Sequence, residues 1–311
     1  MAAGRASEPR TALPVGHLLL LTTAIGWGLN WAVLKAVLRD WPPLFARGVA
    51  GLIACGLLAS LALKRGDSLR VPRALHGRLG LAATINVFAW MGFTALCLNW
   101  LSVAEGALLA YSMPIWATFM AWPLMGERPT TNALIALVLG VAGLVVLMAP
   151  SATGFGALGD KLPGVTLAVA AAVLFAYGAV TGRQPLPLSP VVATAWQVGL
   201  GCLPMVVLGL VMEHPDVGGI GPVAALGVAY MALGPMAACY LTWFAALRRM
   251  PATTAATGML LVPVIGTLAA VPLLGEELGV RQVLAFGLTL GGVGLALRQR
   301  SDTRPTLRPE S

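Results

Sequence analysis

Long apolar blocks dominate this chain and leave few folds open to it. The blocks are about 20 residues long, the length needed to cross a bilayer as a helix, and charged residues gather between them. Backbone groups must be satisfied internally in lipid, so only helices and closed barrels span a membrane. Barrel strands are short and alternate in polarity, which these continuous blocks do not. The pattern predicts an all-α integral membrane protein with ten transmembrane helices.

Composition excludes several other classes of protein. Hydrophobic residues make up 58% of the chain and charged residues 10%, whereas soluble domains carry about 25% charged residues. Disordered chains need low hydrophobicity and high charge. The net charge of +8 lies in loops and tails, which is typical of orientation in a membrane and contact with anionic lipid. We expect no nucleic-acid partner.

Motifs of enzymes and metal sites are not found. The sequence has no GxxxxGK[ST], GxSxG or HExxH pattern, each of which would supply a phosphate loop, a nucleophile or zinc ligands. Its four cysteines lie inside apolar blocks without CxxC spacing, which favours packing over disulfides or metal binding. We therefore predict a protein that is not an enzyme and holds no metal or cofactor.

The sequence also repeats itself. Shifted by about 150 residues, PIWATFMAWPLMGE, which ends at Glu127, falls on PVIGTLAAVPLLGE, which ends at Glu276. Each copy holds five predicted spans. Because five is odd, the second copy enters the membrane from the opposite side, as in many secondary transporters. The predicted organisation is a tail at 1–13, a first repeat at 14–150, an inverted second repeat at 162–297 and a tail at 298–311.

The positive charges predict the orientation. Most of the 20 Lys and Arg residues fall on the side of the two termini, and such an excess marks the cytoplasmic face. We expect a multi-pass protein of the cell inner membrane with both termini in the cytoplasm.

Several motifs resemble the drug/metabolite transporter superfamily, EamA type. They are AIGWGLNWAVLK in the opening span, the LxGE turns that end at Glu127 and Glu276, and Arg47 early in the second span. The resemblance implies ten helices around a central cavity and outward transport of small metabolites. In size and Trp content the chain is similar to the aromatic amino-acid exporter branch. The second repeat departs from the pattern, because Gln197 replaces the Arg and Tyr177 replaces the Trp.

The leading hypothesis is export of small metabolites, above all amino acids with aromatic or other neutral side chains, by alternating access. One alternative is another solute, such as a cationic drug, a nucleotide-related metabolite or a sugar derivative. Another is a non-transporting scaffold or a lipid-modifying membrane protein. Because the spans carry no interior Asp or Glu, and proton-driven carriers usually keep a carboxylate in the pathway, we expect facilitated diffusion.

Aromatic and polar side chains within the spans are the candidates for substrate binding. The candidate residues are Trp27, Asn30, Arg47, Trp90, Tyr111, Tyr177, Trp196, Gln197, Tyr240 and Trp243. Aromatic rings can stack on a flat side chain or contact an ammonium. Packing and helix–helix hydrogen bonds remain the alternative for each of them. Four further tryptophans, which lie near span ends, are expected in the interfacial belt: Trp31, Trp41, Trp100 and Trp122.

Gating residues follow from the repeat and from the charges. Pro114 and Pro263 occupy matched positions in spans four and nine, where each removes a backbone hydrogen bond. Arg47 and Glu105 lie near the outer ends of spans two and four. Either they pair when the outer mouth is closed, or Arg47 attracts a substrate carboxylate. Gly287-xxx-Gly291 offers a close-packing face, which leaves a monomer or a homodimer open.

Overall fold

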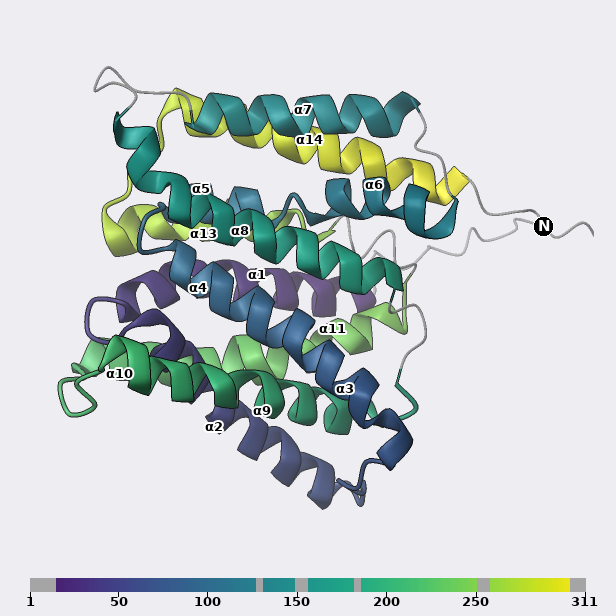
Figure 1. Cartoon of the computed structure of the whole chain (residues 1–311), viewed down its shortest axis with the longest axis vertical. Helices are drawn as coiled ribbons and strands as arrows, with labels where there is room; N and C mark the ends of the chain where they lie inside the picture. The colour runs from purple at the N-terminus through teal and green to yellow at the C-terminus, as the bar shows by residue number, and fades with distance from the viewer. Residues whose placement is uncertain (1–14, 127–130, 149–155, 182–185, 251–257, 303–311) are drawn as a thin grey trace, which may run out of the picture.

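The structure is a bundle of helices joined by short loops (Figure 1). The computed structural model describes residues 15–126, 131–148, 156–181, 186–250 and 258–302, in which there is no strand. Seven helical runs in this part are long and apolar enough to cross a membrane, and a shorter apolar helix is present as well. The all-α fold is confirmed, whereas the count of ten helices stays a prediction. The tail at 1–13 and the motif residue Glu127 lie outside the described residues.

Irregular segments occur in spans three and four of the first half. Its elements are α1 (Val15–Val37), α2 (Pro43–Lys64), η1 (Arg73–Leu75), α3 (His76–Ala83), η2 (Thr84–Gly92), α4 (Phe93–Cys97), α5 (Val103–Ala110), α6 (Met113–Met125) and α7 (Thr131–Met148). The third span is continuous from η1 to α4, and η2 is a π-helix. The fourth span is divided into α5 and α6.

The second half repeats this plan. Its elements are α8 (Gly156–Thr181), α9 (Pro190–Leu208), η3 (Gly209–Glu213), α10 (Pro222–Leu233), η4 (Gly234–Ala238), α11 (Cys239–Leu247), α13 (Leu261–Leu274) and α14 (Val280–Asp302). The helix α14 continues past Leu297, where we expected the span to end. A proline at the start of α9 and of α10 fits the first helical turn, whose N–H groups have no partner within the helix.

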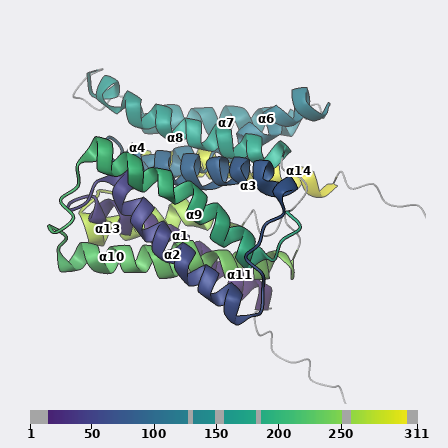
Figure 2. The same cartoon turned by 60° about the horizontal axis from the view of Figure 1, so that its bottom comes forward.

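Helices pack in pairs that the internal repeat relates. The helix α2 packs on α9, and α7 packs on α14; the latter pair lies along one edge of the bundle (Figure 1). The packing of α1 on α13 is matched by that of α8 on α6. In Figure 2, α10 and α11 follow one another along the edge opposite α7. When the two repeats are interchanged, each of these helix pairs falls on an equivalent pair, as two inverted repeats require. The two-repeat fold therefore agrees with the sequence.

The interruptions also occur at matched places. Span four breaks at Tyr111–Ser112, and a turn at Met259–Leu260 precedes α13. Pro114 lies in the first turn of α6 and Pro263 in the first turn of α13, where a missing N–H costs little. The prolines therefore begin new half-helices, which agrees with the expected interruptions; their role in gating is not tested by this.

The LxGE turns owe their glycine to backbone conformation. Gly126 ends α6 with φ 73° and Gly275 ends α13 with φ 72°. A residue with a Cβ pays about 1–2 kcal/mol to adopt this left-handed conformation, and glycine does not. The turn at Gly275 directs the following residue, Glu276, toward α5.

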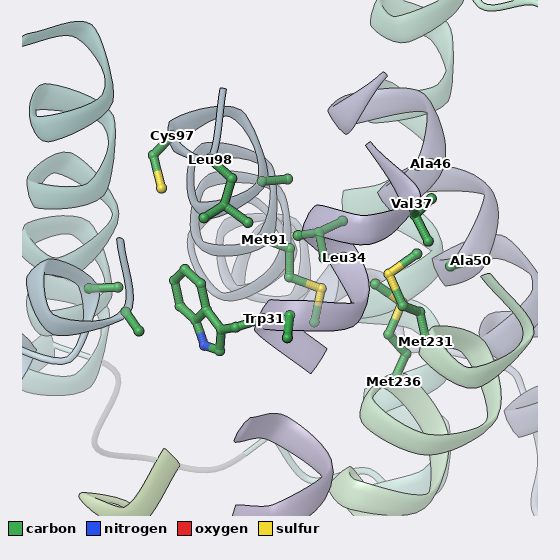
Figure 3. Packing of buried hydrophobic residues seen from close by; sticks show 14 of the residues in the cluster. Trp31, Leu34, Val37, Ala46, Ala50, Met91, Cys97, Leu98, Met231 and Met236 are labelled. Carbon is green, nitrogen blue, oxygen red and sulfur yellow. The ribbon is translucent and has the colours of Figure 1, made fainter. Parts of the chain in front are cut away.

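Small residues allow the two halves to approach closely. A Cβ on Gly209 would lie 2.8 Å from the backbone nitrogen of Phe45, and one on Gly48 would lie 2.8 Å from that of Val206. Close backbone contact of this kind drives helix association in lipid, where hydrophobicity does not. Figure 3 shows Met231 and Met236 packed beside Ala50 at this interface.

Candidate functional site

A buried arginine lies where the two repeats meet. Arg47 on α2 is 6% exposed, as is Asn30 on α1. The Arg47 Nη1 donates to Asn30 Oδ1 at 3.2 Å and contacts the Met231 sulfur at 3.9 Å. The Arg47 Nε is buried and has no hydrogen-bond partner. Ionisable side chains inside a membrane are costly and usually functional, so this arginine defines the candidate site.

The surroundings of Arg47 are polar but carry no counter-charge. In the described part of the chain, the ion pairs involve Lys35 and Lys161, and neither involves Arg47. Its guanidinium interacts electrostatically with the phenol groups of Tyr111 and Tyr240. A buried guanidinium with an unused donor can bind an anionic ligand, because its planar fork fits a carboxylate or phosphate.

One group of rings, the Trp27 cluster, joins α1 to α11. It consists of Trp27, Tyr240 and Trp243. The Trp27 ring centroid lies 5.5 Å from that of Tyr240, in an edge-to-face arrangement, and 5.9 Å from that of Trp243. The Trp27 Nε1 donates to the carbonyl of Pro235 in the π-helix η4 at 2.9 Å. Trp27 and Asn30 are three residues apart on one helix face, so this cluster adjoins Arg47.

A second group, the Trp90 cluster, adjoins the interruption in span four. It consists of Trp90 from η2, Tyr111 from the break and Phe175 from α8. The Trp90 centroid lies 6.0 Å from that of Tyr111 and 4.8 Å from that of Phe175. Because Tyr111 also interacts with Arg47, the arginine connects to both aromatic clusters.

The other three sequence candidates are Gln197, Trp196 and Tyr177, and the hydrogen bonds of the first two go to residues other than Arg47. Gln197 on α9 accepts a hydrogen bond from Asn86 at 3.1 Å. Trp196 is 38% exposed, and its Nε1 donates to the Leu69 carbonyl in the loop before η1. Tyr177 is 41% exposed on α8. Their part in substrate binding stays a prediction.

The outer ends of the spans differ from the expected pairing. Glu105 Oε1 accepts from Lys161 at 2.5 Å, and Arg47 bonds Asn30 instead. Glu105 is held by a capping box, in which its other oxygen accepts the Ser102 N–H at 2.9 Å. The expected pair between Arg47 and Glu105 is therefore absent here, because the cap fixes the carboxylate in the first turn of α5, beside the first turns of α8.

A second ion pair lies beside the first. Lys35 Nζ on α1 is 3.1 Å from Glu276 Oε1 and donates to the Leu101 carbonyl at 2.7 Å. Both oxygens of Glu276 accept the N–H of Val103, at 3.0 and 3.1 Å. Both ion pairs line a cavity of about 500 Å³ at the end of the bundle that is predicted to face outward. Its wall includes Thr267, whose hydroxyl oxygen is buried without a partner.

The expected tryptophan belt is only half correct. Trp100 and Trp122 are 40% and 53% exposed, as a belt requires, but Trp31 and Trp41 are both 7% exposed. Trp41 Nε1 donates to the Asp216 carbonyl at 3.1 Å. Figure 3 shows the Trp31 indole extending from α1 toward Cys97 and Leu98. Nearness to a span end did not reveal that these two rings face neighbouring helices.

Sequence reasoning also missed residues that the structure brings to these places. They are Met231 and Phe175 beside the aromatic and charged groups, and Lys35 and Lys161 in the two ion pairs. The LxGE motif was the one available signal, and it identified Glu276 without its partners. No group of three His, Cys, Asp or Glu in the described residues could hold a metal ion.

Comparison with known proteins gives consistent matches over nearly the whole chain. The sequence model of the EamA-like transporter family matches residues 14–149 and 162–298. A probable amino-acid metabolite efflux pump of Salmonella typhimurium is 28% identical, over 89% of this chain and 93% of that protein. The aromatic amino acid exporter YddG of Ancylobacter novellus is 27% identical, over 78% and 83%.

Further matches agree with these. An uncharacterized transporter of Bacillus subtilis is 28% identical, over 87% of this chain and 86% of that protein. A solved crystal structure has a TM-score of 0.64 and 25% identity, and the match covers 93% of this chain and 99% of the other.

Proposed function

The chain belongs to the EamA-like transporter family, and on this premise we propose that it exports small metabolites bearing a carboxylate, above all amino acids with aromatic or other neutral side chains. The protein is a multi-pass membrane transporter. The proposal concerns its substrate, its direction and its mechanism.

The observation that carries this proposal is the buried, unpaired Arg47. An arginine that is 6% exposed, with an unpartnered Nε, costs several kcal/mol unless an anion compensates it. A substrate carboxylate is such an anion. This favours a carboxylate over a cationic drug, which the arginine would repel.

The aromatic clusters support the choice of side chain. Trp27, Tyr240 and Trp243 present rings at edge-to-face and tilted angles, and aromatic pairs of this geometry contribute about 0.5–1.5 kcal/mol beyond burial. The names of the relatives from Salmonella typhimurium and Ancylobacter novellus point to amino-acid export as well.

The proposed mechanism is alternating access without tight proton coupling. The site lies between inverted repeats, near broken helices in both halves, which is the arrangement of many secondary transporters. Glu105, in the first turn of α5, is already paired with Lys161 and offers no free carboxylate for proton coupling. We place the protein in the inner membrane with both termini in the cytoplasm.

Purified protein in liposomes tests the proposal. Liposomes loaded with labelled aromatic, aliphatic, acidic and basic amino acids should release the aromatic and neutral ones faster than protein-free liposomes do. Labelled sugars and a cationic dye serve as comparison solutes. The proposal would be refuted if no amino acid left the liposomes faster than it leaves protein-free liposomes. Selective release of the dye would favour the drug alternative.

A further inference from the structure

Both ion pairs at the outer face join one repeat to the other. Lys35 on α1 belongs to the first repeat and Glu276 to the second; Glu105 on α5 belongs to the first and Lys161 on α8 to the second. The side chains are partly buried, with exposures from 9% for Glu105 to 39% for Lys161. Pairs at such depth are screened less than pairs on an open surface.

The two pairs meet on the first turn of α5. Glu276 accepts the N–H of Val103, the first residue of this helix, and Glu105, the third residue of the helix, completes its capping box with Ser102. A carboxylate at a helix N-terminus is favoured by the helix dipole. The outer end of α5 is therefore fastened to α1, α8 and the loop after α13 through four charged side chains.

The other end of α5 reaches the candidate site. The helix has 8 residues, which makes it about 12 Å long at 1.5 Å per residue. It ends at Tyr111, whose phenol interacts with Arg47 and whose ring meets Trp90. One short rigid element thus has the cross-repeat ion pairs at one end and the proposed substrate site at the other.

Buried groups lie directly behind the ion pairs. Thr267 on α13 lines the outer cavity, is 4% exposed and has an unpartnered hydroxyl oxygen. A Cβ on Gly106 of α5 would lie 3.3 Å from the Trp31 ring, and one on Gly266 of α13 would lie 3.3 Å from the Trp31 Cβ. Trp31 therefore fills the space between α5 and α13, and separating those helices would uncover it.

We propose that Lys35–Glu276 and Glu105–Lys161 form an outer latch, which holds the outer mouth closed and which α5 couples to substrate binding at Tyr111 and Arg47. The inference rests on the proposed alternating access. Opening the outer face separates the repeats at α5, and both pairs must then break. Because coupling between sites is reciprocal, weakening the latch also changes affinity at the substrate site.

Labelling of a cysteine from outside tests the latch without any substrate. The four native cysteines are replaced, and Thr267→Cys is introduced as a reporter behind the pairs. Its reaction with a membrane-impermeant thiol reagent added outside measures how often the mouth opens. Lys35→Gln and Lys161→Gln should each raise the labelling rate about five-fold, as expected for loss of about 1 kcal/mol per pair. The double variant should show about a twenty-five-fold rise if the pairs act independently.

Matched controls separate the latch from general loosening. Arg39→Gln removes another exposed positive charge near the outer end of α1 and should leave the Thr267→Cys rate unchanged. Leu278→Cys, at a rim position that is already 39% exposed, should react equally fast with and without the latch. Glu105→Gln keeps an oxygen for the capping box while removing the charge, so it should match Lys161→Gln.

A second experiment remains informative if the neutral variants fold poorly. A short bifunctional thiol reagent that joins Lys161→Cys to Glu105→Cys should stop transport and suppress labelling of Thr267→Cys, and reduction of a cleavable reagent should restore both. Transport that continues after complete crosslinking would overturn the latch, as would unchanged labelling in the double Gln variant. The labelling result does not depend on which solute is carried, so failure of the amino-acid proposal would be seen separately.

Discussion

Replacing Arg47 with Met separates a binding role from a structural one. The change removes the charge and keeps a long unbranched side chain. It loses a hydrogen bond from a charged donor to Asn30, 3.2 Å long and worth about 1.5–3 kcal/mol. It also removes a guanidinium that is 6% exposed with an unpartnered Nε, whose burial costs several kcal/mol. The two terms oppose each other, so we expect the free energy of unfolding to stay within about 1 kcal/mol of wild type or to rise.

Binding should respond in the opposite direction. Loss of a charge-assisted contact with a carboxylate costs about 1.5–3 kcal/mol, which weakens apparent affinity roughly 10- to 150-fold. The assays are the melting temperature in detergent without substrate and the KM for amino-acid release from liposomes. Arg47→Lys keeps the charge but not the planar fork, so its KM should lie between the values of the wild type and of Arg47→Met. Arg39→Met, at an exposed position after α1, should change neither the melting temperature nor the KM. A large fall in melting temperature together with a wild-type KM would refute the binding role.

Four other results are expected. Trp27→Ala should lower the preference for phenylalanine over alanine roughly 2- to 12-fold, as the ratio of kcat/KM values, if rings contribute about 0.5–1.5 kcal/mol; Trp27→Phe should retain most of it, and an unchanged ratio in the Ala variant argues against the cluster. Gly28→Ala should destabilise by about 1–3 kcal/mol, because its Cβ would lie 2.6 Å from a side-chain carbon of α13. Gly287→Ala, with no atom within 4 Å, should melt as wild type, and equal melting of both variants would contradict the packing. Pro114→Ala and Pro263→Ala should each slow transport at normal expression, whereas wild-type rates would leave them as ordinary helix starts. An imposed pH gradient should not change steady-state accumulation, and a steep dependence would contradict facilitated diffusion.

Features that the membrane itself enforces were predictable from sequence. Apolar length and the need to satisfy backbone groups require helices, and the repeat predicts exchanged pairs such as α2 with α9. The interruptions near Pro114 and Pro263 followed from missing N–H groups at matched positions. The same repeat accounts for π-helices in spans three and eight, which begin at Thr84 and Gly234.

Side-chain direction was not predictable in the same way. Depth along a span suggested that Arg47 and Glu105 meet, but depth does not fix the rotation of a helix. Rotation directs Arg47 toward Asn30, and the capping box directs Glu105 toward Lys161. Rotation equally explains why Trp31 is buried although it lies near a span end. Phe175 carried no signal, because one apolar ring in an apolar span resembles any other.

Discrimination between an amino acid and its amide tests the carboxylate claim most directly. Phenylalanine and phenylalaninamide share the ring and the amine and differ at the group that Arg47 is proposed to bind. Liposomes containing the wild-type protein should release phenylalanine and release the amide at least ten-fold more slowly, consistent with a contact of about 1.5 kcal/mol or more. In Arg47→Met the two rates should converge. Equal protein-dependent release of the acid and the amide by the wild type would contradict the account.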